Sequence, residues 1–169
     1  MNMKKLLSWS TVILISFCLS SCTSQVQHTD QFYNDSDSFP YLRFPLIKPY
    51  YVDSAAVTGG NEPWTMYLKK LWAPPNYLYL YSVTDLRKLS VKGNVIMAYS
   101  PYVDEQADQS VRENYYHWFV VVVDKNTEAG FHTESAFLEY IQQPDWQSPD
   151  NLHDKYFSTG CLPWIPDCK

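Results

Sequence analysis

The residues that could carry out nucleophilic or metal-assisted chemistry are scattered along this 169-residue chain rather than grouped in a motif. Neither G-x-S-x-G nor S-x-x-K, which surround an activated serine, occurs in the sequence, and H-E-x-x-H, which presents two zinc-binding histidines, is also missing. Asp104, Glu105 and Asp108 could supply the acid pair of a glycosidase, but a polar stretch like theirs is typical of solvated charges. The sequence therefore predicts no catalytic residue, no metal site and no cofactor.

The histidines each have a structural explanation that requires no chemistry. His28 lies in a polar stretch near the N-terminus and is expected to be solvated. His117 lies within a run of strand-forming residues, where a bond from its ring to a neighbouring group would account for it. His132 precedes an expected helix, and local structure is sufficient reason for it. His153 lies in the C-terminal tail, and we expect it to be exposed.

The N-terminus has the organisation of an export signal. Lys4 and Lys5 precede an uncharged and mostly apolar run over residues 6–19. A helix of that length spans about 21 Å, whereas the hydrocarbon core of a bilayer is roughly 30 Å thick. The run therefore fits a secretory signal better than a transmembrane helix.

Leu19-Ser20-Ser21-Cys22 resembles the lipobox of bacterial lipoproteins. The resemblance covers residues 1–22, in which the basic start, the apolar run, the small pair and the cysteine follow the family's order. It implies that residues 1–21 are a signal peptide, that a diacylglyceryl group is attached to the Cys22 sulfur, and that the chain is cleaved before Cys22. Such an anchor is effectively permanent, because it carries more than the single acyl chain that binds only marginally. An ordinary cleaved signal, in which Cys22 is incidental, is the alternative.

The anchor predicts a location outside the cytoplasm and a membrane as the first partner. In enteric-type sorting, an aspartate after the lipidated cysteine resembles an inner-membrane retention signal. Residue 23 is threonine, so the outer membrane is favoured if the source is Gram-negative. Residues 22–38 are polar and are expected to form a tether, and residues 39–169 are expected to form a single domain.

Cys161 and Cys168 are the other cysteines of the exported chain, because Cys18 would leave with the signal. Thiols pair in the oxidising compartments outside the cytoplasm. Pro163 and Pro166 bend the segment between them, so a small disulfide loop that pins the C-terminus is expected. Free thiols, an intermolecular pair and a metal site are the alternatives. A metal site has little support, since zinc sites of this style use two closely spaced pairs.

Aromatic residues are frequent for a chain of this length, with 14 tyrosines and six tryptophans. Tyr77, Tyr79 and Tyr81 alternate with leucines, so a strand would place the three rings on one face. Tyrosine is enriched at binding hot spots, which makes this row the predicted binding surface. The alternative is that the rings only cover the sheet of a small, proline-rich fold.

Apolar runs separated by turn residues predict an α+β domain with a small, mostly antiparallel sheet. Residues 39–51 contain three prolines, which permit an edge strand but not a helix. Residues 77–83 are rich in strand formers, and residues 86–92 and 95–100 flank a Gly-Asn pair that predicts a hairpin. The run over residues 115–123 is apolar at both alternating sets of positions, so both of its faces should be covered.

Two segments are expected to be helical. Residues 64–72 have apolar side chains at helical spacing, although a short strand in which Trp64, Met66 and Leu68 alternate is the rival interpretation. Near the C-terminus, Thr133 is a predicted N-cap for a helix that ends before Pro144 and packs across the sheet. Its apolar stripe consists of Ala136, Phe137, Tyr140 and Ile141. The tail over residues 145–169 contains prolines and no clear periodicity, and it is expected to be coil held down by aromatic side chains.

The net charge of the chain argues against one class of function. A formal net charge of −5 argues against nucleic-acid binding, which requires a basic face. The leading hypothesis is a membrane-anchored envelope lipoprotein whose non-catalytic binding or structural domain recognises an envelope protein or glycan. An immunity or inhibitor lipoprotein is the alternative, because an acidic surface complements a basic toxin. A hydrolase that acts on envelope material is the third hypothesis.

Overall fold

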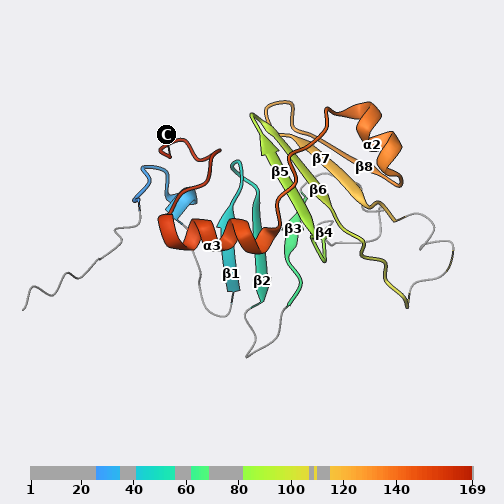
Figure 1. Ribbon diagram of the computed structural model, residues 1–169, viewed down its shortest axis with the longest axis horizontal. Coiled ribbons are helices and arrows are strands. Elements are labelled where there is room, and N and C mark those ends of the chain that lie inside the picture. The colour runs from blue at the N-terminus through green and yellow to red at the C-terminus, as the bar shows by residue number, and fades with distance from the viewer. Residues whose placement is uncertain are drawn as a thin grey trace, which may run out of the picture.

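A computed structural model describes residues 26–34, 41–55, 62–68, 82–106, 109 and 115–168. The described residues form two antiparallel sheets of four strands each, together with η1, α2 and α3, which confirms the predicted α+β class (Figure 1). Within the described residues, no helix is both long enough and apolar enough to span a membrane. The elements in chain order are η1 (Gln31–Asn34), β1 (Tyr41–Pro45), β2 (Tyr51–Ala55), β3 (Thr65–Tyr67), β4 (Ser82–Val83), β5 (Lys88–Lys92), β6 (Val95–Tyr99), β7 (Trp118–Val122), β8 (Thr127–Phe131), α2 (Glu134–Tyr140) and α3 (Pro149–Thr159).

The first sheet has the strand order β1-β2-β3-β4. β1 is an edge strand, which the prolines of this region permit, and Pro45 lies opposite Tyr51 at its end. Proline is tolerated in an edge strand because some N–H groups of such a strand do not donate to a neighbouring strand. Phe44 and Val52 lie opposite each other on β1 and β2, and both are fully buried.

The expected helix over residues 64–72 is not formed at its start, where β3 lies instead. Trp64, Met66 and Leu68 are buried, while Thr65 and Tyr67 between them are partly exposed. This alternation has the period of two residues that a strand requires. The two interpretations were hard to separate because Trp64 and Leu68, four residues apart, share a face in either conformation.

The second sheet has the order β5-β6-β7-β8, and its hairpins are local. The Gly-Asn pair joins β5 to β6 as predicted, with Gly93 at a φ of +57° that favours glycine. β7 is an inner strand whose two faces are both covered, as its apolar sequence predicted. Phe119 and Val121 point into the main core, whereas Trp118 and Val120 point to the opposite face.

Helix α2 covers the outer face of the second sheet. Thr133 is its N-cap, as predicted, and its side chain accepts a hydrogen bond from the Ala136 N–H. Phe137 is fully buried, with its ring centroid 5.4 Å from that of Trp118. The buried stripe is narrower than expected, because Ala136 is exposed and Tyr140 is 49% exposed.

The tail contains a helix where coil was expected. Ser148 accepts a hydrogen bond from the Asn151 N–H as the N-cap of α3, and Pro149 occupies the first turn, where proline is favourable. Gly160 ends the helix in the left-handed conformation, at a φ of +70°. Leu152 and Tyr156, one turn apart, are buried in the core.

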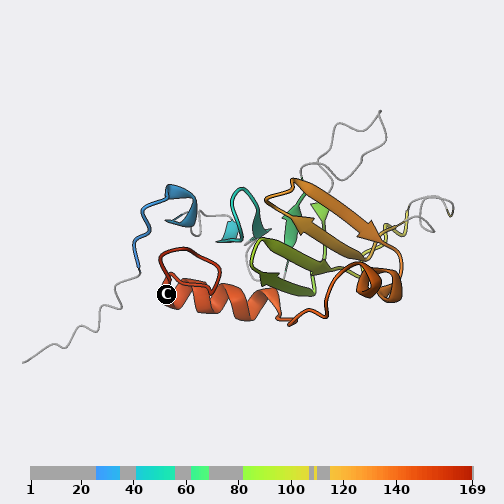
Figure 2. The ribbon, with the colours of Figure 1, turned by 90° about the horizontal axis from the view of Figure 1, so that it is seen from above.

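One core cluster joins the two sheets and α3 into a single packed unit. It includes Met66 of the first sheet, Ile96 and Phe119 of the second, and Leu152 of α3. Seen from above, α3 runs along one side of the strands (Figure 2). In both views, η1 and the loop over residues 161–168 lie at one end of the longest axis, and α2 lies toward the other (Figures 1 and 2).

Candidate functional site

Some of the predicted functional residues lie outside the described part of the chain. Cys22 and the row formed by Tyr77, Tyr79 and Tyr81 lie outside the described residues, so the lipidation site and the aromatic row remain predictions. Two other features stand out in the described part of the chain. One is a cleft at the N-terminal end of α3, and the other is the packing of the N-terminal segment against the C-terminal loop.

The cleft has a volume of about 720 Å³ and lies where both sheets approach the start of α3. Its walls come from the ends of β1 and β2, the approach to β3, the connection from β4 to β5, the segment after β6 and the first turn of α3. The charged and aromatic side chains of the described lining are Glu62, Trp64, Asp85, Arg87, Tyr102 and Asp150.

One wall of the cleft is fixed by a bond between the first sheet and α3. The Trp64 indole N–H donates to an Asp150 carboxylate oxygen 2.7 Å away, and the Trp64 carbonyl accepts from the Leu86 N–H at 2.9 Å. Trp64 also packs against Phe44, with the ring centroids 5.4 Å apart. Three segments that are distant in sequence are therefore held together at this position.

The turn between β4 and β5 forms another part of the lining. Asp85 adopts a φ of +56°, which is uncommon outside glycine, and its carboxylate forms an ion pair with the Arg87 Nε, 2.8 Å away. Buried Ser100 donates its hydroxyl to the Thr84 carbonyl and accepts from the Tyr102 N–H at 3.0 Å. These bonds hold the turn and the start of the segment after β6 in one arrangement.

The charges of the cleft lining are predominantly negative. Among its described residues, the carboxylates of Glu62, Asp85 and Asp150 are set against one guanidinium, that of Arg87. The ring of Tyr102 is 41% exposed and offers an amphipathic contact surface. This combination suits a ligand that brings positive charge and apolar surface together.

His117 and His132 have the structural roles expected of them. The His117 ring is bonded through Nδ1 to the Ser100 carbonyl at 3.0 Å, and the His132 ring through Nδ1 to the Tyr115 carbonyl at 2.8 Å. The expectation that His153 is exposed is wrong, because its side chain is only 12% exposed. It packs over the face of Trp64, with the ring centroids 5.2 Å apart, since helix α3 brings it there.

The carboxylates of the loop after β6 are not gathered into a site by the described structure. Asp104 accepts a hydrogen bond from the Gln106 N–H at 2.9 Å, which is an ordinary turn contact, and Glu105 is exposed. Asp108 lies outside the described residues.

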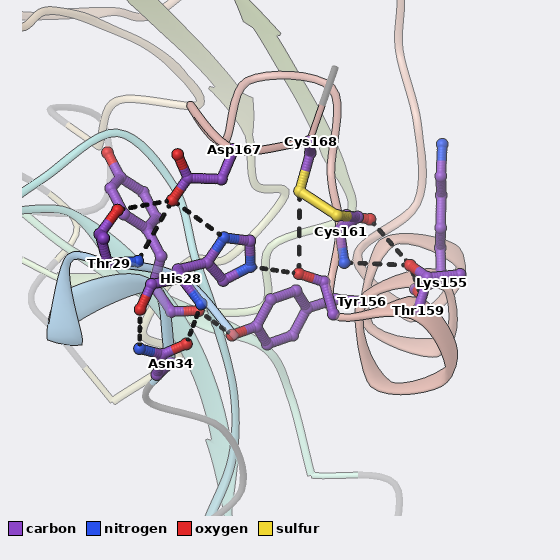
Figure 3. The surroundings of a disulfide bond; sticks show 11 residues. His28, Thr29, Asn34, Lys155, Tyr156, Thr159, Cys161, Asp167 and Cys168 are labelled. Atoms are coloured by element: carbon purple, nitrogen blue, oxygen red, sulfur yellow. Dashed lines mark hydrogen bonds and ion pairs between the residues drawn. A yellow bond between two sulfur atoms is a disulfide. The ribbon is translucent and has the colours of Figure 1, made fainter. Parts of the chain in front are cut away.

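The expectation that His28 is solvated is also wrong. His28 is 3% exposed, and its Nε2 lies 2.6 Å from the Gly160 carbonyl oxygen (Figure 3). Its backbone forms two reciprocal hydrogen bonds with the Asn34 side chain, which close residues 28–34 into a compact turn. Phe32 and Tyr33, two aromatic residues within an otherwise polar stretch, were the sequence signal that this segment packs on the domain.

We call residues 26–34 the docked segment, because side chains along it bind the domain. The buried Tyr156 hydroxyl donates to the Tyr33 carbonyl, and the Thr29 N–H and hydroxyl both donate to Asp167 (Figure 3). These bonds from Thr29 hold the pKa of Asp167 below its usual value. Lys48 likewise bonds Asp30 and lowers the pKa of that carboxyl. Part of the expected tether therefore belongs to the folded unit.

A disulfide joins Cys161 and Cys168, which confirms the expected pairing. The Cα atoms lie 5.4 Å apart, and the closed loop packs Leu162 and Ile165 into the core. Trp164 donates its indole N–H to the Pro45 carbonyl at 3.2 Å. The loop therefore completes the surface on which the docked segment lies.

Comparison with known proteins identifies no relative: no family model, no curated protein and no solved structure matches this chain.

Proposed function

We propose that this chain is a bacterial lipoprotein, anchored by lipid on Cys22, whose non-catalytic domain binds a polypeptide partner in the cleft. The anchor rests on the basic start, the apolar run and the Leu19-Ser20-Ser21-Cys22 sequence. The location that follows is outside the cytoplasm, with the outer membrane favoured if the source is Gram-negative.

The observation that carries the binding role is the composition of the cleft. Among the described lining residues, three carboxylates outnumber one guanidinium, and that guanidinium is already paired with Asp85. A partner segment with basic side chains would find carboxylates to pair with and the exposed ring of Tyr102 to pack against. Complementary charge of this kind also accelerates encounter between the partners.

The docked segment determines which part of the domain lies near the lipid anchor. Val26 lies four positions after Cys22, and a fully extended chain over that separation spans at most about 14 Å. A lipid on Cys22 would therefore keep the docked segment close to the bilayer. The cleft lies at the other end of α3, so the length of this 11-residue helix, about 16 Å, separates it from the docked segment.

Site-specific photo-crosslinking in cells tests the binding role. We expect a photoreactive residue at position 102 to give a discrete protein adduct, and the same residue in place of Tyr140, exposed on α2, to give none. Charge reversal by Glu62→Lys should lower the adduct yield, whereas Glu139→Lys on α2 should not. The proposal fails if position 102 gives no adduct, or if the adduct forms equally with both reversals.

The protein found in the adduct distinguishes a structural or assembly function from an immunity function. A resident envelope protein indicates a structural or assembly function. A basic toxin indicates an immunity function, which the predominantly acidic lining also favours.

A further inference from the structure

The corner where the docked segment meets the disulfide holds three side chains of the types that bind soft metal ions. A ring nitrogen of His28 and the sulfur atoms of Cys161 and Cys168 all lie within 4.8 Å of one another. The histidine is buried and both cysteines are partly buried. Nothing in the sequence pointed to this cluster, because His28 is 133 residues away from the first of the two cysteines.

The hydrogen bonds of His28 define which of its nitrogens is free. Nε2 lies 2.6 Å from the Gly160 carbonyl, which can only accept, so Nε2 carries the proton of a neutral ring. The lone pair is then on Nδ1, a buried atom without a hydrogen-bond partner among the described residues. Metal-binding histidines are typically oriented in this way, through a bond from the second ring nitrogen to a carbonyl or carboxylate.

The surroundings of Nδ1 favour a positive charge. The Oδ2 atom of Asp167 lies 3.7 Å from Nδ1, which is too long for a hydrogen bond. A lone pair and a carboxylate that face each other at this distance repel unless a cation lies between them. A proton on Nδ1 would satisfy this requirement, and so would a metal ion.

We propose that reduction of the Cys161–Cys168 disulfide converts this corner into a site for one thiophilic d¹⁰ cation such as Zn²⁺. The ligands are the two sulfur atoms and the His28 imidazole, with Asp167 able to supply the fourth position. Two thiolates, one imidazole and one oxygen form a tetrahedral set typical of zinc. The inference concerns this corner alone and does not depend on the lipid anchor or on the cleft.

The chemistry balances with a dithiol as the reductant. The dithiol gives two electrons and two protons to the disulfide, which becomes two thiols, and the dithiol itself is oxidised to a disulfide. Each cysteine thiol then loses its proton to solvent as its sulfur binds the cation. The site therefore has two exclusive states, a disulfide or a bound metal.

Zinc titration of the full chain in detergent tests the proposal. The protein is reduced with a dithiol, freed of reductant without oxygen, and titrated with Zn²⁺ against a chromophoric chelator. We expect one Zn²⁺ per reduced chain and none for the oxidised chain. His28→Gln should weaken binding at least tenfold, and the double Cys161→Ser, Cys168→Ser variant should abolish it, while His132→Gln leaves it unchanged.

A second measurement does not depend on whether the variants fold. In the reduced wild-type chain, Zn²⁺ should slow alkylation of Cys161 and Cys168 at least tenfold, as mapped by peptide mass analysis. The proposal is overturned if the reduced chain binds no Zn²⁺, if the oxidised chain binds it equally, or if alkylation of the two cysteines is not slowed. Unchanged affinity in a folded His28→Gln variant would remove His28 from the site and overturn the proposal as stated.

Discussion

Replacing Tyr156 by phenylalanine tests whether the docked segment is a stable part of the fold. The substitution removes one hydroxyl and preserves the ring, which is 4% exposed. That hydroxyl donates to the Tyr33 carbonyl, so its loss leaves a buried acceptor without this partner. Leaving a buried polar group unsatisfied costs about 1–3 kcal/mol, and we expect the free energy of unfolding to fall by that amount.

Urea denaturation measures this loss directly. For a small domain with a slope of about 2 kcal/mol per molar urea, a loss of 1–3 kcal/mol moves the midpoint down by roughly 0.5–1.5 M. Tyr140→Phe is the matched control, because it removes the same atom from a side chain that is 49% exposed. The control should stay within about 0.5 kcal/mol of wild type. Equal midpoints for the two variants would refute the docking of residues 26–34.

Two further predictions concern the second sheet and its contact with the first. Phe137→Ala should lower the free energy of unfolding by about 3–5 kcal/mol, because the ring is fully buried. Leu138→Ala is the control and should cost far less, because that side chain is 42% exposed. Thermal melts that rank the two variants the other way would contradict the described packing of α2. Burial, together with the hydrogen bond to Glu128, raises the pKa of Tyr50 above its usual 10. As pH rises above about 10, the unfolded chain therefore loses the Tyr50 proton before the folded chain does, and the free energy of unfolding falls. The difference in unfolding free energy between wild type and Tyr50→Phe should therefore shrink between pH 9 and 11, and a constant difference would argue against this linkage.

The elements that could be predicted from the sequence are those with local causes. The β5–β6 hairpin follows from its Gly-Asn turn, and β7 from an apolar run that is long enough to be covered on both faces. The cap of α2 follows from Thr133, and the disulfide from two cysteines in a tail that the N-terminal sequence predicts to be exported. In each case the residues that decide the structure lie within a few positions of one another.

The elements that were missed depend on context or on distant partners. Ser148, Pro149 and Gly160 are start and stop signals for α3, but prolines elsewhere in the tail favoured coil. The burial of His28 depends on Gly160, 132 residues away, and no local pattern contains that information.

The cleft could not be predicted for the same reason. Its lining comes from segments of both sheets and from α3, and their proximity exists only in the folded chain. The tyrosine row over residues 77–81 was the available sequence signal for a binding surface, and it remains a prediction outside the described residues.

Mass spectrometry of the protein extracted from membranes tests the central claim, that Cys22 carries a lipid. We expect the N-terminal peptide to begin at Cys22 and to bear a diacylglyceryl group on its sulfur, and Cys22→Ala to leave an unprocessed precursor without acyl label. A wild-type peptide that begins elsewhere, or that begins at Cys22 with a free thiol, would contradict the account.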